Sequence, residues 1–183
     1  MVYIFFAEGF EEIEALAPMD FLRRAKIPVT SVSLSPGAVK GAHGISVVPD
    51  AVFSDVNFSD AEVIVLPGGM PGTVNLDQFP AISDLLSSVW SKGGYLAAIC
   101  AAPTILAKRG YLTEKEAICY PGFRIEDYGA RISEKSVVRD GRIITAKSAG
   151  VAWQFAYSVA EIFVGREVCE KVREDLFLLP FGE

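Results

Sequence analysis

Three short apolar segments constrain the fold of this chain more than any other feature. They cover residues 2–6, 62–66 and 95–99, and nearly every position in them is apolar. Continuous apolar character, rather than alternation, is typical of parallel strands that are buried on both faces. Each segment is followed by a stretch with helical spacing of apolar residues. Strands that alternate with helices predict an α/β fold, with a mostly parallel central sheet between two layers of helices.

The remainder of the chain contains further elements of the same kind. The expected helices cover 12–24, 81–90, 103–109, 152–163 and 166–177. The other expected strands cover 29–34 and 117–120, with a weaker extended segment at 45–48. A hairpin is expected at 136–145, with its turn at Asp140-Gly141. Because the chain has no composition break, linker or internal repeat, we expect a single domain over residues 1–183.

Composition argues against several classes of partner. The chain has 17 basic and 23 acidic residues, a net charge of −6, and no Lys/Arg cluster, so nucleic acid and anionic membranes are poor candidates. The apolar segment 2–7 is too short for a signal peptide or a membrane span. Three scattered cysteines indicate a reducing cytoplasm rather than a disulfide scaffold. With His43 as the single histidine, no metal site is expected.

Cys100 follows the third apolar segment and precedes a helix that has Pro103 in its first turn. This position resembles the nucleophile elbow of α/β enzymes. Free backbone N–H groups and the helix dipole at such a turn favour a thiolate, which predicts a lowered pKa for Cys100. A free cysteine can also be a small buried hydrophobe, and the local pattern alone leaves both interpretations open.

Two other loops are expected to meet Cys100, because the carboxyl ends of parallel strands share one edge of the sheet. Glu14 follows the first strand, and the missing N–H of Pro18, four residues later, is expected to bend the helix and aim Glu14 at that edge. We interpret Glu11 and Glu12 only as acidic residues that favour a helix N-terminus.

Gly68 and Gly69 follow the second strand. The surrounding stretch matches neither a phosphate loop nor a dinucleotide-binding motif. The N–H groups of the two glycines, completed by that of Ala101, could form an oxyanion pocket. A plain tight turn is the alternative.

Together these residues resemble the DJ-1/ThiJ/PfpI superfamily, and the match extends over essentially the whole chain. The stretches that carry it are Glu11–Glu14, Val65–Gly69, Ala97–Pro103, and the Asp140-Gly141 hairpin followed by 146–156. The resemblance is to the branch nearest DJ-1 and bacterial ThiJ-like proteins. It implies a flavodoxin-like α/β/α sandwich, usually a homodimer, with Cys100 as the reactive thiol. It also implies that Glu14 hydrogen-bonds the thiol and that Gly69 and Ala101 supply backbone donors.

The chain departs from the family pattern in two places. Many relatives have a histidine near the cysteine, whereas this chain has Cys119–Pro121 there. His43 lies in a segment that resembles a dimer contact rather than the pocket. Tyr120 could donate a hydrogen bond to a substrate oxygen, and strand alternation allows only one of Cys119 and Tyr120 to face the pocket. Ser148–Gly150 replaces a common Gly-Pro-Gly.

The resemblance also predicts how the site ionises. A thiolate and a carboxylate in contact repel, so one of the two groups keeps a proton. We expect Cys100 to be ionised and Glu14 to be protonated, with a raised pKa.

These features support two main functions. The first is a cofactor-independent glyoxalase or deglycase, in which Cys100 attacks methylglyoxal-type α-oxoaldehydes and Glu14 carries the proton. The second is a redox sensor or chaperone-like stress protein in which an oxidant modifies Cys100. A peptidase is less well supported, because no histidine base lies near Cys100. The apolar tail 176–181 is expected to cover the protein's own core, with a partner contact as the alternative.

Overall fold

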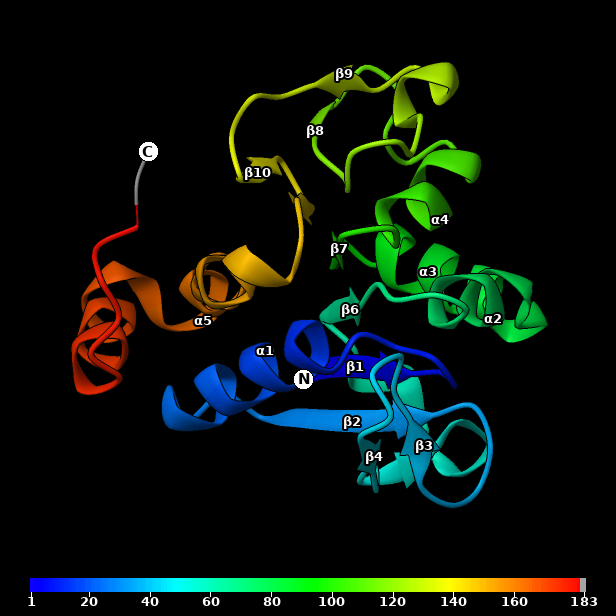
Figure 1. Ribbon diagram of the computed structural model, residues 1–183, viewed down its shortest axis with the longest axis horizontal. Helices are drawn as coiled ribbons and strands as arrows, with labels where there is room; N and C mark the ends of the chain where they lie inside the picture. Colours follow the sequence, from blue (N-terminus) through cyan, green and yellow to red (C-terminus); the bar gives the residue numbers. More distant parts are fainter. Residues whose placement is uncertain (182–183) are drawn as a thin grey trace.

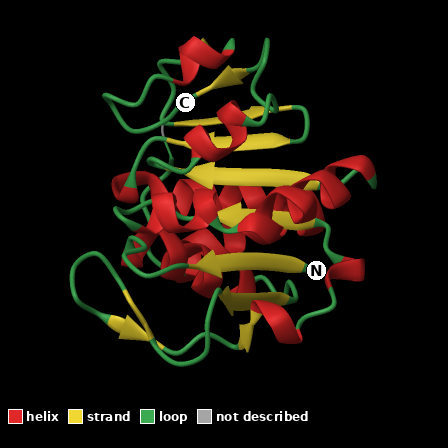
Figure 2. Cartoon of the chain, turned by 90° about the vertical axis from the view of Figure 1, so that its right-hand side faces the viewer, coloured by secondary structure: helices red, strands yellow, loops and turns green. Residues whose placement is uncertain are grey.

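A seven-stranded sheet forms the centre of the computed structural model, which describes residues 1–181. The strand order is β10-β11-β7-β6-β1-β2-β5, and all neighbouring strands are parallel except β10 and β11. Figure 2 shows these strands side by side. Their bounds are β1 Val2–Phe6, β2 Val29–Ser33, β5 Ala51–Val52, β6 Val63–Leu66, β7 Tyr95–Ile99, β10 Val137–Asp140 and β11 Ile143–Ala146.

Helices cover both faces of this sheet (Figure 1). Helices α1 and α5 pack against each other on one face, and α2, α3 and α4 lie on the other. Their bounds are α1 Glu12–Arg24, α2 Gly72–Gln78, α3 Pro80–Ser91, α4 Pro103–Lys108 and α5 Ala152–Asp175. The arrangement confirms the predicted flavodoxin-like sandwich. No helix within residues 1–181 combines the length and the apolar character that crossing a bilayer requires.

The core explains why the central strands are apolar at every position. In β1, Ile4 and Phe6 contact the cluster beneath α1 and α5, whereas Tyr3 and Phe5 contact the cluster beneath α2, α3 and α4. Both phenylalanines are fully buried. Burial of each such side chain stabilises the fold by roughly 1.5–3 kcal/mol. A polar residue on either face of β1 would lose that contribution, so β1 does not show the alternation of apolar and polar residues that a strand with one exposed face has.

The prediction of a strand at 117–120 is largely wrong. Only Glu116–Ala117 is extended, as β8, and it pairs with β9 (Arg131–Ile132) outside the central sheet. The following residues leave the strand because their backbone groups bond elsewhere. Ile118 donates its N–H to Thr145 Oγ1, and Tyr120 donates its N–H to the carbonyl of Cys100.

The C-terminal region contains the two predicted helices. They join as α5 across a kink at Gly165, whose φ of 72° is not helical and suits glycine. In the tail beyond it, Phe177 and Leu179 are 93% and 83% exposed, so these two side chains do not cover the core. Phe181 does pack, edge-on against the ring of Tyr157.

A small hairpin lies apart from the main sheet. Its strands are β3 (Val39–Lys40) and β4 (Ser46–Val47), and the second falls within the extended segment predicted at 45–48. Backbone hydrogen bonds join the hairpin to the start of α1, from Gly9 N–H to the Lys40 carbonyl and from Ala42 N–H to the Phe10 carbonyl. The hairpin is therefore held over the loop that follows β1.

Candidate active site

The carboxyl ends of β1, β6 and β7 meet where the strand order of the sheet reverses. On one side of β1 the sheet extends through β2 to β5, and on the other side it extends through β6 and β7 to β11. Ligands of parallel α/β sheets bind at such a switch point. The segments that carry Glu14, Gly68–Gly69 and Cys100 begin there, as the sequence predicted, with Glu14 in the first turn of α1.

Cys100 occupies a strained turn between β7 and α4. Its φ of 64° is unusual for a residue with a side chain and costs about 1–3 kcal/mol. Two hydrogen bonds hold it in place: its N–H donates to the Ala146 carbonyl at 2.9 Å, and its carbonyl accepts the Tyr120 N–H at 2.8 Å. The side chain is half-buried. This is the nucleophile-elbow geometry that the sequence predicted.

Glu14 lies against Cys100 and is only 1% exposed. The two side chains are hydrogen-bonded to each other, and Glu14 Oε2 also accepts the N–H of Gly68 at 2.9 Å. A Cβ on Gly68 would stand 2.6 Å from both Cys100 Cβ and Glu14 Oε2, so only glycine lets the carboxyl reach the thiol. The N–H of Gly68 is therefore committed to Glu14 and is not the oxyanion donor that the sequence suggested.

Two backbone donors point at the sulfur. The N–H groups of Gly69 and Ala101 hydrogen-bond Cys100, and both residues line its cavity. The structure thus brings together the pair of donors that the sequence predicted. A third backbone group comes from the Ser148–Gly150 stretch: the N–H of Ala149 bonds to Glu14, because β11 ends beside β7 and the next residues close over the carboxyl.

Burial dominates the ionisation of the pair. It raises the pKa of Glu14 to about 7, against the lowering effect of the hydrogen bonds that the carboxylate accepts. Burial, together with the charge of an ionised Glu14, raises the pKa of the Cys100 thiol to about 12. The predicted lowering is therefore wrong for a thiol beside an ionised Glu14, because Gly69 and Ala101 do not outweigh these effects. Above about pH 7 the pair therefore holds one proton, and at neutral pH Glu14 is about half protonated.

A Glu14→Gln variant is expected to change how stability depends on pH. A carboxyl whose pKa rises from 4.5 to about 7 on folding favours the folded state at low pH, and this contribution is lost as pH rises between those values. Wild type should therefore lose about 2–3 kcal/mol of unfolding free energy relative to Glu14→Gln between pH 5 and pH 8. Urea unfolding at both pH values measures this, with the exposed Glu167→Gln as control. If the unfolding free energies of wild type and Glu14→Gln changed equally between the two pH values, the raised pKa of Glu14 would be contradicted.

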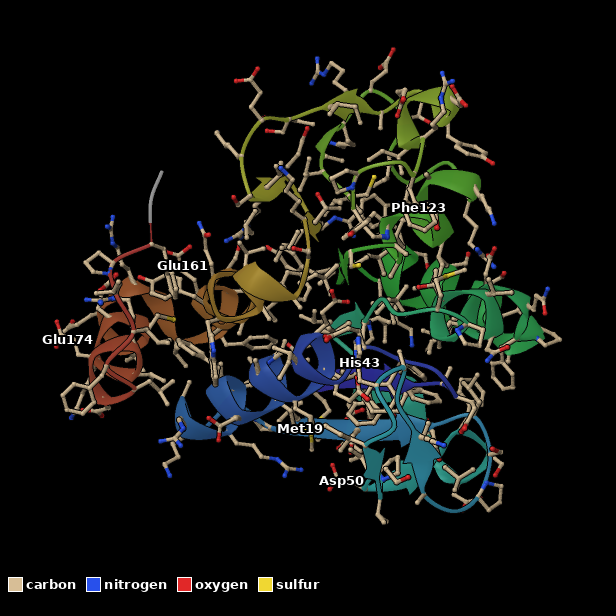
Figure 3. All side chains as sticks on the ribbon, viewed as in Figure 1. Met19, His43, Asp50, Phe123, Glu161 and Glu174 are labelled. Carbon is tan, nitrogen blue, oxygen red and sulfur yellow. The ribbon has the colours of Figure 1, made fainter. Side chains whose placement is uncertain are left out.

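His43 reaches the site, contrary to the sequence interpretation. The β3–β4 hairpin brings it beside the start of α1 (Figure 3), where it borders the cavity over Cys100. That cavity has a volume of about 250 Å³. Its lining residues are Glu11, Ala42, His43, Gly69, Met70, Cys100, Ala101, Tyr120 and Phe123. Tyr120 faces this cavity, whereas Cys119 points away and donates its Sγ–H to the Phe123 carbonyl, so only one of the two lines the pocket.

Glu12 fixes His43 and is more than a helix-terminal charge. It is 2% exposed, its Oε1 accepts the N–H of His43 at 2.8 Å and of Ile45 at 3.3 Å, and its Oε2 is 2.8 Å from His43 Nδ1. The hydrogen bond and charge of Glu12 raise the pKa of His43. No local pattern reveals this contact, because about thirty residues separate the partners.

Glu11, Glu12 and His43 bring three possible metal ligands within 4.8 Å of one another. Both oxygens of Glu12 already accept hydrogen bonds from the hairpin, and Glu11 Oε2 accepts the N–H of Glu14 at 2.7 Å. Each of these carboxylates thus anchors a backbone N–H group of the protein.

Replacing Glu12 with alanine is expected to destabilise the protein by about 2 kcal/mol, because the hairpin N–H groups lose their buried acceptor. That corresponds to roughly 4–8 °C in Tm for a chain of this size. Glu12→Gln, which keeps the acceptor Oε1, should recover most of the loss. Glu8→Ala is the matched control, since exposed Glu8 bonds the same hairpin through Lys40 N–H. Equal Tm values for Glu8→Ala and Glu12→Ala would refute the anchoring role.

Comparisons with known proteins identify the family of this chain. The chain matches the DJ-1/PfpI family over residues 1–162. It is 38% identical to protein dj-1beta of Drosophila melanogaster over 179 residues, covering 96% of this chain and 95% of the relative. It is 34% identical to the glutathione-independent glyoxalase DJR-1.2 of Caenorhabditis elegans, covering 93% of this chain and 92% of that protein.

Solved structures give the same result. The crystal structure of Drosophila melanogaster DJ-1beta superposes with a TM-score of 0.91 at 36% identity and covers 98% of each chain. Oxidized DJ-1 of Toxoplasma gondii superposes with a TM-score of 0.90 at 30% identity, again covering 98% of each chain. With the family match over residues 1–162 and these similarities in sequence and fold, the chain belongs to the DJ-1/PfpI family.

Proposed function

We propose that this protein is a glyoxalase that converts methylglyoxal-type α-oxoaldehydes into 2-hydroxy acids through Cys100, with no organic cofactor. The observation that carries the proposal is the contact between a half-exposed thiol and a buried carboxyl that share one proton, with two backbone donors at the sulfur. The similarity to a relative named as a glutathione-independent glyoxalase supports the same chemistry.

The first step uses the shared proton. In the form where Glu14 holds it, the Cys100 thiolate adds to the aldehyde carbon, and the carbonyl electron pair moves onto oxygen. The N–H groups of Gly69 and Ala101 stabilise the developing charge, and Glu14 donates its proton to that oxygen. The product is a hemithioacetal, and Glu14 is left as a carboxylate.

The second step is an internal redox exchange. The Glu14 carboxylate removes the hydrogen of the former aldehyde carbon as a proton and returns it to the former ketone carbon. The hydroxyl proton of the hemithioacetal passes to the ketone oxygen. The aldehyde carbon is oxidised to a thioester while the ketone carbon is reduced to an alcohol, so no external oxidant is needed. Water then hydrolyses the thioester, releasing the 2-hydroxy acid and the Cys100 thiol.

The surroundings suit this cycle. A pKa of about 7 lets Glu14 act as both acid and base at neutral pH, where general acid–base catalysis is most effective. His43 and Tyr120 border the cavity as possible hydrogen-bond donors to the second carbonyl oxygen. Because Nδ1 of His43 faces Glu12, its Nε2 is the ring nitrogen left for a ligand.

A redox sensor is the second candidate, supported by the accessibility of the same sulfur. Oxidation of Cys100 to a sulfinate would place acceptor oxygens near the N–H groups of Gly69 and Ala101 and beside a protonated Glu14. The two functions share their residues but differ in turnover, since a sensor is modified once and an enzyme is regenerated.

Consumption of methylglyoxal without glutathione distinguishes them. We expect each protein molecule to consume many equivalents, with lactate as the product and an unmodified Cys100 in intact-mass spectra. Loss of one equivalent, with a stable adduct on Cys100, would overturn the glyoxalase. Rapid peroxide oxidation of Cys100 without turnover would support the sensor.

A further inference from the structure

The tip of the β3–β4 hairpin is fixed by its backbone. Every N–H group of residues 41–45 has a partner: Gly41 donates to the Ile45 carbonyl, Gly44 to the Gly41 carbonyl, Ala42 to the Phe10 carbonyl, and His43 and Ile45 to Glu12 Oε1. A Cβ on Gly41 would overlap Glu12 Oε1, so glycine lets the hairpin approach this carboxylate. His43 is therefore held in one place, although its side chain is 66% exposed.

Glu12 also sets which ring nitrogen of His43 is available. Glu12 Oε2 lies 2.8 Å from Nδ1, and Glu11 Oε1 lies 3.9 Å from the same nitrogen. A carboxylate only accepts hydrogen bonds, so Nδ1 carries a proton and Nε2 of the neutral ring carries the lone pair. A carboxylate that orients an imidazole in this way stabilises the imidazolium that forms when Nε2 takes up a proton.

The proposed reaction needs a base that is open to solvent. A neutral aldehyde and water become a 2-hydroxy acid, which ionises at neutral pH, so each turnover releases one proton. Glu14 is 1% exposed and cannot pass that proton directly to bulk water. The thioester on Cys100 must also be attacked by water, and a positioned base accelerates such a step about 10²–10⁴-fold.

His43 suits this task better than the other side chains of the Cys100 cavity. Apart from Cys100, the ionisable residues that line the cavity are Glu11, His43 and Tyr120. Glu11 Oε2 already accepts the N–H of Glu14, and a phenol at neutral pH donates a proton rather than accepting one. The imidazole instead borders the cavity and is exposed to solvent.

We propose that His43 is the general base that activates water for hydrolysis of the acylated Cys100 and passes the released proton to solvent, with Glu12 as its positioning residue. The identity of the natural acyl group rests on the proposed glyoxalase function. The role of His43 stands on the cavity and on the contact with Glu12, so it extends to other small acyl groups on Cys100.

The step balances in atoms and protons. Water adds to the thioester carbon while His43 Nε2 takes one of its protons, and the carbonyl electron pair moves onto oxygen, where the N–H groups of Gly69 and Ala101 stabilise it. The carbonyl re-forms as the C–S bond breaks, and the bonding pair leaves with the sulfur of Cys100. The acid product gives its proton to the Glu14 carboxylate, and His43 releases its own proton to solvent.

Acetylation of Cys100 by p-nitrophenyl acetate tests His43 without any aldehyde. Hydrolysis of acetyl-Cys100, followed by intact mass, should be about a hundredfold slower in His43→Asn than in wild type, because a general base is lost. The asparagine amide still donates to Glu12 Oε2, so the Tm should match that of wild type. Ser46→Ala, on the same hairpin but outside the cavity, should hydrolyse at the wild-type rate. Equal rates in wild type and His43→Asn would overturn the inference.

Glu12→Gln tests the positioning role. Its amide oxygen still accepts the hairpin N–H groups, whereas its NH₂ group donates to Nδ1 and leaves the ring proton on Nε2. Hydrolysis of acetyl-Cys100 should therefore slow about as much as in His43→Asn, at a nearly unchanged Tm. Hydrolysis at the wild-type rate would refute the role of Glu12. Added imidazole should accelerate hydrolysis in His43→Ala but not in wild type, a rescue that a purely structural defect would not show.

Methylglyoxal separates this inference from the proposed function. His43→Asn should accumulate a thioester on Cys100 that hydroxylamine releases as lactohydroxamate, whereas wild type should not. Turnover by His43→Asn at the wild-type rate, without a thioester, would overturn the role of His43 and leave the glyoxalase standing. Hydrolysis of acetyl-Cys100 that depends on His43, without methylglyoxal turnover by wild type, would refute the glyoxalase and leave the role of His43 standing.

Discussion

Replacing Cys100 with serine is expected to lower kcat/KM for methylglyoxal about a thousandfold or more, because the proposed reaction needs a covalent bond to sulfur. A serine hydroxyl ionises far less readily than a thiol, and Glu14, with a pKa of about 7, is too weak a base to deprotonate it. The Cys100→Ser protein should retain the turn geometry, because Ala146 and Tyr120 bond to the backbone of residue 100 rather than to its side chain. The measurement is initial-rate kinetics with lactate quantified as product.

The two remaining cysteines provide the controls for this prediction. Cys119 is buried and donates to the Phe123 carbonyl, and Cys169 is buried within the cluster beneath α1 and α5. Cys119→Ser and Cys169→Ser should therefore retain turnover wherever they fold. A Cys100→Ser protein with more than about one tenth of the wild-type rate would show that the sulfur is not the nucleophile.

A Gly69→Ala substitution is expected to have the largest effect on stability, a loss of about 3 kcal/mol or more. Its φ of +88° disfavours a side chain, and an added Cβ would stand 2.6 Å from the Gly9 carbonyl oxygen and would also overlap the N–H of Glu11. Backbone strain and overpacking each contribute about 1–3 kcal/mol. For a chain of this size the combined loss corresponds to roughly 6–12 °C in Tm. Thermal unfolding monitored by circular dichroism measures it.

Gly93→Ala separates the two causes. Gly93 has nearly the same φ, +89°, but no atom lies within 4 Å of its added Cβ. The Gly93→Ala protein should therefore lose only the part of the unfolding free energy that comes from backbone strain, about 1 kcal/mol. If both substitutions lower Tm equally, the close approach of Gly69 to Gly9 and Glu11 does not contribute to stability.

Much of the fold follows from local pattern. The continuous apolar segments at β1, β6 and β7 predict a sheet buried on both faces, because each such strand must pack helices on two sides. Parallel strands place their carboxyl ends at one edge, so Glu14, Gly69 and Cys100 could be expected together without any coordinates. The strand expected at 117–120 failed because hydrogen bonds to Thr145 and Cys100, which are distant in sequence, compete with strand pairing.

Other parts of the site depend on contacts that no local pattern encodes. His43 has no motif around it, and it reaches the cavity only because Glu12 buries its carboxylate beneath the hairpin. The pKa of Cys100 is a similar case, since a strand-to-helix turn favours a thiolate while burial and a neighbouring carboxylate oppose it. The balance depends on how deeply the pair is buried.

The sequence by itself therefore determined the α/β sandwich, and it predicted the edge of the sheet where the candidate site lies and the proximity of Cys100 and Glu14. Hydrophobic periodicity and the chemistry of a strand-to-helix turn act over a few residues, so a sequence displays them directly. Only the tertiary structure decided that His43 joins the site and that Glu14 rather than Cys100 titrates near neutrality. Those outcomes depend on which distant backbone and side-chain groups share a buried volume, because burial sets both hydrogen-bond satisfaction and the cost of charge.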